Sequence, residues 1–142
     1  MKARILLLLF FAALFVCIVL PASAVGVADE VRITTSSPEA RSDYVKALSL
    51  INSIRTDEAR KVLAHATALD PAFAMAHYML SVLAPTTERA MAHISTALSL
   101  TAKVTDGERL LIEAHHALIT GDVTTSEELT RKVVVMHPED VW

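Results

Sequence analysis

The chain has 142 residues, enough for one domain, and 53% of them are hydrophobic. Three glycines and five prolines supply little turn material, which disfavours an all-β protein and favours helices. The formal net charge is −3, and apart from two adjacent pairs the lysines and arginines are scattered singly along the chain. A phosphate-binding surface needs clustered basic residues, so we do not expect a nucleic acid partner.

The first 24 residues have the pattern of an export signal. Lys2 and Arg4 precede an unbroken apolar run over residues 5–20, and residues 22–24 (Ala-Ser-Ala) form a cleavage sequence of small residues. We therefore predict a signal peptide over residues 1–24 that is cleaved after Ala24, and a mature protein that is periplasmic or extracellular. The run of 16 residues is shorter than the roughly 20 that cross a bilayer, so an uncleaved membrane anchor is the alternative.

Residues 25–36 show no helical period and are expected to form a flexible linker, followed by a helical domain over residues 37–142. Ser37 and Pro38 mark the start of the first helix, because serine caps the first turn and proline at the first helical position loses no needed donor. We expect this helix to run to about Asn52. Its apolar residues fall on one stripe at a 3.6-residue period: Ala40, Tyr44, Ala47, Leu48 and Ile51.

Prolines separate the next three helices. The second begins at Thr56 and ends at Asp70-Pro71, because the residue before proline is held out of helical geometry. A third helix is expected from about residue 72 to 83 and a fourth from 88 to 100, with a break at Pro85 between them. The residues expected to face the core are Ala59, Val62, Leu63, Ala66 and Leu69 in the second helix and Ala90, Ile94, Ala97 and Leu98 in the fourth.

Capping patterns predict the last two helices. Residues 105–108 (Thr-Asp-Gly-Glu) form a capping box at the head of the fifth helix, and Gly121 ends that helix by tolerating a left-handed backbone. Thr125 and Glu128 repeat the box at the head of the sixth helix. We expect the sixth helix to close at residues 137–138, His-Pro.

These helical pairs recur at a spacing near 34 residues, and in this respect the chain resembles the tetratricopeptide repeat (TPR) family, whose 34-residue unit is a helix-turn-helix. Residues 76–81 resemble the start of the first helix of a repeat, residues 66–71 resemble its closing motif, and residues 121–122 resemble the turn between its helices. The chain departs from the family at Thr130, which stands where the family has a large apolar residue, and at Val133, which replaces an alanine.

The resemblance implies an all-α fold, a right-handed superhelical stack of about three repeats (an α-solenoid), and a non-catalytic scaffold or adaptor that binds a protein or peptide. The family's groove positions correspond to Tyr44, Leu48, Met75, Tyr78, Met79, Val82 and His115 in this chain. Aromatic and methionine side chains at these positions would suit an apolar partner. The alternative for the two tyrosines is that they only pack between helices.

The sequence stops at Trp142, where the resemblance would place the start of another helix, so the repeat domain is expected to be incomplete at its C-terminus. An alternative function is therefore a truncated regulatory fragment of a larger envelope enzyme or of a secretion or assembly complex. The sixth helix is also expected to present an apolar edge, which a missing neighbour or a second copy of the chain would cover.

The six histidines raise the question of a metal or catalytic site. Four of them lie on separate helices: His65, His77, His93 and His137. No pair stands at i, i+4 with an allied carboxylate, and the neighbours His115 and His116 point about 100° apart on a helix. Phosphate-binding loops and glycine-flanked nucleophiles are absent from the sequence as well. We therefore expect no metal, no cofactor and no enzymatic activity; an enzyme would be a third class of function, with turnover that depends on His115 or His116.

Overall fold

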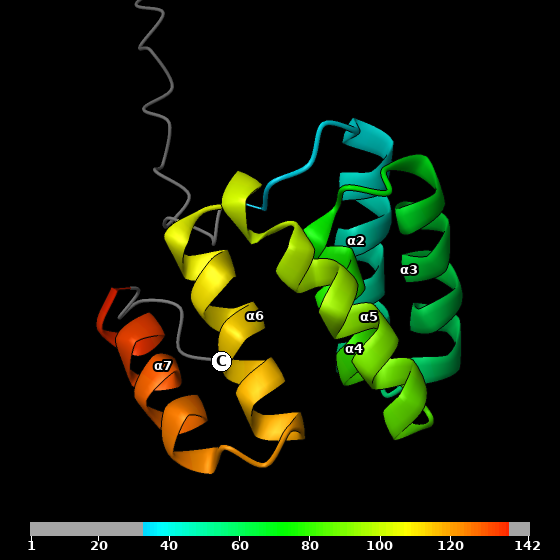
Figure 1. Cartoon of the computed structure of the whole chain (residues 1–142). Coiled ribbons are helices and arrows are strands. Elements are labelled where there is room, and N and C mark those ends of the chain that lie inside the picture. The colour runs from blue at the N-terminus through cyan, green and yellow to red at the C-terminus, as the bar shows by residue number, and fades with distance from the viewer. Residues whose placement is uncertain (1–32, 137–142) are drawn as a thin grey trace, which may run out of the picture.

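The computed structural model describes residues 33–136, and within this range the chain forms helices and no strands (Figure 1). The prediction of an all-α fold is confirmed for these residues. None of their helices is long and apolar enough to cross a membrane. The predicted signal peptide and the predicted end of the last helix lie outside the described residues. The elements, in order, are α2 (Pro38–Asn52), α3 (Thr56–Leu69), α4 (Ala74–Val82), α5 (Thr87–Ser99), the short 3₁₀ helix η1 (Thr101–Lys103), α6 (Asp106–Ile119) and α7 (Val123–Met136).

Local capping signals fix the starts of α2 and α6 as predicted. The Ser37 hydroxyl accepts a hydrogen bond from the backbone N–H of Ala40 at 3.1 Å, and Pro38 occupies the first helical position of α2. At the head of α6, the Thr105 side chain accepts from the Glu108 backbone while the Glu108 carboxylate accepts from the Thr105 backbone. At the start of each of these helices, backbone N–H groups that have no partner within the helix are therefore hydrogen-bonded to a side chain three positions away.

The start of α4 differs slightly from its predicted position. It begins at Ala74 rather than near residue 72, because the backbone N–H of Ala72 donates to the Asp70 carboxylate at 3.0 Å. The N–H of Phe73 also donates to the Asp70 carbonyl, at 3.0 Å. Asp70 therefore folds the three residues after it into a turn of their own, as aspartate does readily.

The predicted capping box of Thr125 and Glu128 is wrong. α7 begins at Val123, two residues before Thr125, and the backbone N–H of Thr125 donates to Asp122 Oδ1 at 3.1 Å. Asp122 is therefore the residue that caps the helix. The physical reason is Gly121, whose φ of 88° turns the chain at once and brings Asp122 to the cap position.

Two helices end in the same left-handed turn with different residues. Gly121 is the left-handed residue of the turn after α6, as predicted, and Ile54, with a φ of 59°, has the same place after α2. In both turns the residue after the left-handed one donates its N–H to a carbonyl of the helix's last turn at 2.9 Å, which is the Schellman arrangement. Ile54 is a β-branched residue in a backbone region that favours glycine, so this turn is strained.

The helices pack as three consecutive pairs. α2 packs on α3, α4 on α5 and α6 on α7, while contacts between α3 and α4 and between α5 and α6 join the pairs (Figure 1). α4 also contacts α6. Each pair thus covers part of the apolar surface of its neighbour, which is how helical pairs too small for a core of their own are stabilised.

The core runs along the contacts between the pairs. Leu63, Phe73, Ile94 and Ile112 are its largest fully buried apolar side chains, and completely buried alanines allow the helices to approach closely. The predictions that Leu63 and Ile94 face the core are confirmed. Leu69 was predicted in the same set but is 36% exposed, and it is the final residue of α3.

A short segment before α2, which we call the strap (residues 33–36), crosses the ends of several helices (Figure 1). The sequence predicted these residues as the end of a flexible linker; in the structure hydrogen bonds join them to the helical domain. The backbone N–H of Thr34 donates to Glu108 Oε1 at 2.7 Å, and the Thr34 hydroxyl donates to Glu108 Oε2 at 2.6 Å. The strap is thereby bound to the first turn of α6, 74 residues away in the sequence.

The other end of the strap is bound to the turn between α3 and α4. Asp70 Oδ2 accepts hydrogen bonds from the Thr35 hydroxyl at 2.6 Å, from the Ser36 backbone at 3.1 Å and from the Ser36 hydroxyl at 3.3 Å. The Arg41 guanidinium in α2 donates to the carbonyl of Ile33. The strap therefore joins all three helical pairs at one end of the molecule.

Candidate interaction surface

Two residues predicted for the groove lie in the hydrophobic core instead. The Tyr44 side chain is 4% exposed, and its ring centroid is 5.3 Å from that of Phe73. Burial raises the pKa of the Tyr44 phenol above its usual range, and the nearby Tyr78 and Glu108 raise it further. Met75 is buried in the same core. The groove assignment is therefore corrected for Tyr44 and Met75, because the turn before α4 and the packed helices cover them.

The other five predicted residues remain partly or largely accessible. Leu48 in α2, Tyr78 and Met79 in α4 and His115 in α6 are half-buried, and the Val82 side chain is 43% exposed. We call this set the α2–α4–α6 surface. Within it, the rings of Tyr78 and His115 are in edge-to-face contact, with centroids 5.5 Å apart. Burial raises the pKa of the Tyr78 phenol. Leucine, methionine and valine supply the rest of this surface beside His115, so it is predominantly apolar.

A serine and a histidine meet beside this surface. The Ser81 hydroxyl donates to the carbonyl of Ala90 at 2.9 Å, and its oxygen lies 3.1 Å from His115 Nε2. Burial lowers the pKa of His115, and the neighbouring His116 lowers it further, which favours the neutral imidazole. This pair therefore holds α4, α5 and α6 together.

Three of the other histidines contact neighbouring groups in the described part of the chain. His65 Nδ1 lies 2.6 Å from Asp43 Oδ2, which joins α3 to α2. His77 and His93 stack with ring centroids 5.8 Å apart, and burial lowers the pKa of both. His77 Nε2 is 3.3 Å from the carbonyl of Pro71, and its buried Nδ1 has no hydrogen-bond partner. Among the residues that the structure describes, no three histidine, cysteine, aspartate or glutamate side chains are grouped to hold a metal ion.

A groove with several basic side chains lies between α3, the end of α4 and α5. Its volume is about 530 Å³, and Arg60, Lys61, Arg89 and His93 contribute to its lining. The Arg60 guanidinium is already paired with Asp57, which also lines the groove. The positive charge of Arg89 contributes to lowering the pKa of His93. Of the lysines and arginines that line this groove, Lys61 and Arg89 are left to interact with a ligand. Two such cations are typical of an ordinary solvated surface.

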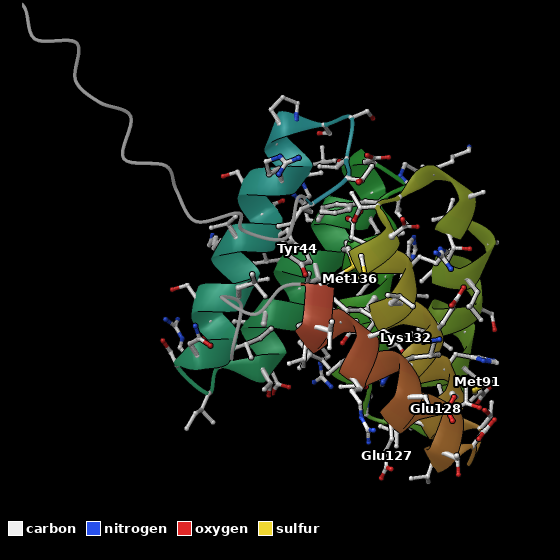
Figure 2. All side chains as sticks on the ribbon, turned by 90° about the vertical axis from the view of Figure 1, so that its left-hand side faces the viewer. Tyr44, Met91, Glu127, Glu128, Lys132 and Met136 are labelled. Carbon is white, nitrogen blue, oxygen red and sulfur yellow. The ribbon has the colours of Figure 1, made fainter. Side chains whose placement is uncertain are left out.

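The last helical pair exposes more large apolar side chains than the rest of the described chain. They are Leu118 in α6 and Val123, Val134, Val135 and Met136 in α7. Three of them line a groove of about 480 Å³ along one side of α7, together with Ser126, Glu127, Thr130 and Arg131. We call this groove and its rim the α7 outer surface. Figure 2 shows α7 in the foreground, with Glu127, Glu128, Lys132 and Met136 along it.

The carboxylates of Asp70 and Glu108 are the polar residues of the interior whose wider role the sequence did not reveal. Both are buried, and each binds a different part of the strap. The hydrogen bond from the Thr35 hydroxyl is the main cause that lowers the pKa of Asp70, against the opposing effect of burial. The only local signal was the run of hydroxyl residues 34–37 just before the first helix.

In comparisons with family models, with curated proteins and with solved structures, the chain has no significant match.

Proposed function

We propose that the protein is an exported, non-catalytic scaffold whose helical pairs form TPR-like repeats stacked as a solenoid. Three observations support the repeat interpretation: the helices follow one another in pairs, each pair packs on the next, and equivalent residues recur near the expected interval. Tyr44 and Tyr78, for example, stand 34 positions apart in α2 and α4. In such arrays the binding surface is built from several repeats rather than from a pocket in one of them.

The observation that carries the binding role is the α2–α4–α6 surface. It brings apolar and aromatic side chains from three different helices to a partly exposed position, and the phenol and imidazole within it are uncharged at neutral pH. A partner that covered Val82 and the exposed parts of Tyr78 and Met79 would gain from burying apolar area. A peptide or an amphipathic helix with apolar anchors has the matching chemistry.

The test begins with cross-linking of cells that express the full chain, followed by identification of the cross-linked protein and measurement of its affinity for purified variants. Val82→Lys should weaken binding roughly tenfold or more, since it buries a charge in an apolar contact. Ile54→Lys is the matched control, because Ile54 is an exposed apolar residue outside this surface. Equal affinity of the two variants would contradict the surface assignment, and the absence of any partner would contradict the scaffold.

Export is tested separately by fractionation and by sequencing the N-terminus of the recovered protein. The proposal expects the protein outside the cytoplasm with Val25 as its first residue. A protein that begins at Met1 in the cytoplasm would refute this part of the proposal without affecting the binding role.

A further inference from the structure

Two imidazole rings meet between α4 and α5 in an arrangement that disfavours their charged forms. The ring of His77 in α4 lies against that of His93 in α5, with centroids 5.8 Å apart and an interplanar angle of 33°. We call this contact the His77–His93 stack. Both side chains are half-buried. Two positive charges at this distance repel each other, so protonation of one ring opposes protonation of the other.

The surroundings of His77 offer no acceptor for a second proton. Its Nε2 is 3.3 Å from the carbonyl oxygen of Pro71, and because a carbonyl oxygen can only accept, Nε2 is the donor in this hydrogen bond. Nδ1 is then the nitrogen that a second proton would occupy, and it is buried without a hydrogen-bond partner among the described residues. A charged ring would therefore place a new N–H where nothing described accepts from it, which costs free energy.

The charged groups that α3 and α5 place around His93 are mostly cations. Arg89 stands one turn before His93, and after burial its charge is the next cause that lowers the pKa of His93. From α3, Asp57, Arg60 and Lys61 line the groove that His93 and Arg89 also line. Asp57 is paired with Arg60. The lining of this groove therefore supplies three cations and one acid that is already paired, which does not favour a further positive charge.

The ionisable groups on the other sides of α4 are also engaged elsewhere. In the turn before α4, the Asp70 carboxylate accepts hydrogen bonds from the strap and from the backbone N–H that follows the turn's proline. From α6, His115 Nε2 lies 3.1 Å from the Ser81 hydroxyl, one turn beyond His77. Burial lowers the pKa of His115, so this ring also favours its neutral form. The contacts of α4 with α5 and α6 thus both include a neutral imidazole.

We propose that the His77–His93 stack is an acid-sensitive contact, which holds α4 against α5 at neutral pH and opens when the rings take up protons below about pH 6. The stability it contributes is present above the unfolded pKa of about 6.5 and is lost as the pH falls through the lower folded values. This inference goes beyond the proposed function and needs no partner. Because α4 also carries Tyr78 and Met79, its release would disturb the α2–α4–α6 surface.

The first measurement is an NMR titration of the imidazole signals between roughly pH 8 and 5, using protein purified from expression of the full chain. We expect the pKa values of His77 and His93 to lie below the ordinary value of about 6.5. The pKa of each should rise when the other is replaced by glutamine, since the repulsion between the rings is removed. A pKa at or above the ordinary value for either residue, or titrations that are independent of each other, would overturn the proposal.

The second measurement is urea denaturation at roughly pH 7.5 and 5.5, which tests the effect on the fold. The equilibrium constant of unfolding should rise roughly tenfold over this range in the unmodified protein, and much less in His77→Gln/His93→Gln. His65→Gln is the matched control and should keep the acid effect, because His65 is an exposed histidine that contacts Asp43 instead of the stack.

An acid effect of equal size in the unmodified protein and in the double variant would contradict the proposal. If the double variant does not fold, the titration of the unmodified protein still decides, because it requires no substitution to show whether both rings resist protonation. Failure of the Val82 binding test leaves both measurements unaffected, so the proposed function and this contact are refuted by different results.

Discussion

Replacing Glu108 by alanine should destabilise the fold more than replacing any exposed acid, because this carboxylate holds the strap. The side chain is completely buried. Its two oxygens accept from the backbone and hydroxyl of Thr34 at 2.7 and 2.6 Å and from the backbone and hydroxyl of Thr105 at 2.9 and 3.0 Å. Alanine removes all four contacts and leaves two backbone N–H groups without their acceptor.

The size of the effect follows from these contacts. Hydrogen bonds to a charged group contribute about 1.5–3 kcal/mol each, but relief of the carboxylate's burial offsets part of the loss. Loss of the capping box accounts for about 1 kcal/mol of the total. We therefore expect Glu108→Ala to lower the free energy of unfolding by about 3–4 kcal/mol, which corresponds to a fall in Tm of roughly 15 °C for a domain of this size.

Urea denaturation followed by circular dichroism measures this free energy directly. Thr34→Val removes only one hydroxyl and should cost about 1 kcal/mol, and the same substitution should cost much less when Glu108 is already alanine. Glu88→Ala is the matched control, because Glu88 is an exposed acid in the first turn of α5. It should change stability by less than about 0.5 kcal/mol.

Two results would refute this reasoning about the strap. One is a decrease in the free energy of unfolding for Glu108→Ala that is no larger than the decrease for Glu88→Ala. The other is strict additivity of Thr34→Val and Glu108→Ala, since residues joined by two hydrogen bonds should be coupled.

Three further predictions follow from other parts of the fold. The hydrogen bond from Thr35 lowers the pKa of Asp70. The stability contributed by this carboxylate is therefore present above the unfolded pKa of about 3.9 and is lost as the pH falls through the lower folded value. Urea midpoints should decrease over this acid range, and less steeply in Asp70→Asn. Ile54→Gly should raise the free energy of unfolding, measured by urea denaturation, by about 1 kcal/mol, because it removes the strain of a β-branched residue in left-handed geometry. An unchanged urea midpoint would argue against strain at this position. Ile94→Ala should open a cavity in the core, lower the free energy of unfolding by about 3–4 kcal/mol and so lower Tm. A decrease in this free energy below about 1 kcal/mol would show that the site is not closely packed.

The sequence predicted those features that depend on residues close together in the chain. The cap at Ser37, the box of Thr105 and Glu108 and the turn at Gly121 each involve partners within a few positions, so composition and spacing contain the necessary information. The same reasoning failed at Thr125, because two cap candidates three residues apart compete and only the preceding turn decides between them.

Features that depend on distant partners were not predictable in this way. The strap binds Glu108 across 74 residues, and no local pattern distinguishes a carboxylate that only caps its own helix from one that also binds another segment. Tyr44 and Met75 have the spacing of groove residues, but both are buried in the core, and the Tyr44 ring packs on that of Phe73. Ile54 shows that a helix can end in a left-handed turn without glycine, and residue type alone did not indicate this turn.

The strap also changes how the chain must fold. A linear array of repeats can gain structure unit by unit and lose it by fraying from either end, because each unit contacts only its neighbours. Here the strap, which precedes α2, is bound to the first turn of α6, so this native contact forms only after α6 has been synthesised. Closing that loop costs roughly 4 kcal/mol of chain entropy. Because the hydrogen bonds between the strap and Glu108 exist only when both ends are folded, they couple α2 through α6 into one cooperative block. Beyond the tie lies α7, whose amide hydrogens should exchange with solvent through local opening well before those of the block.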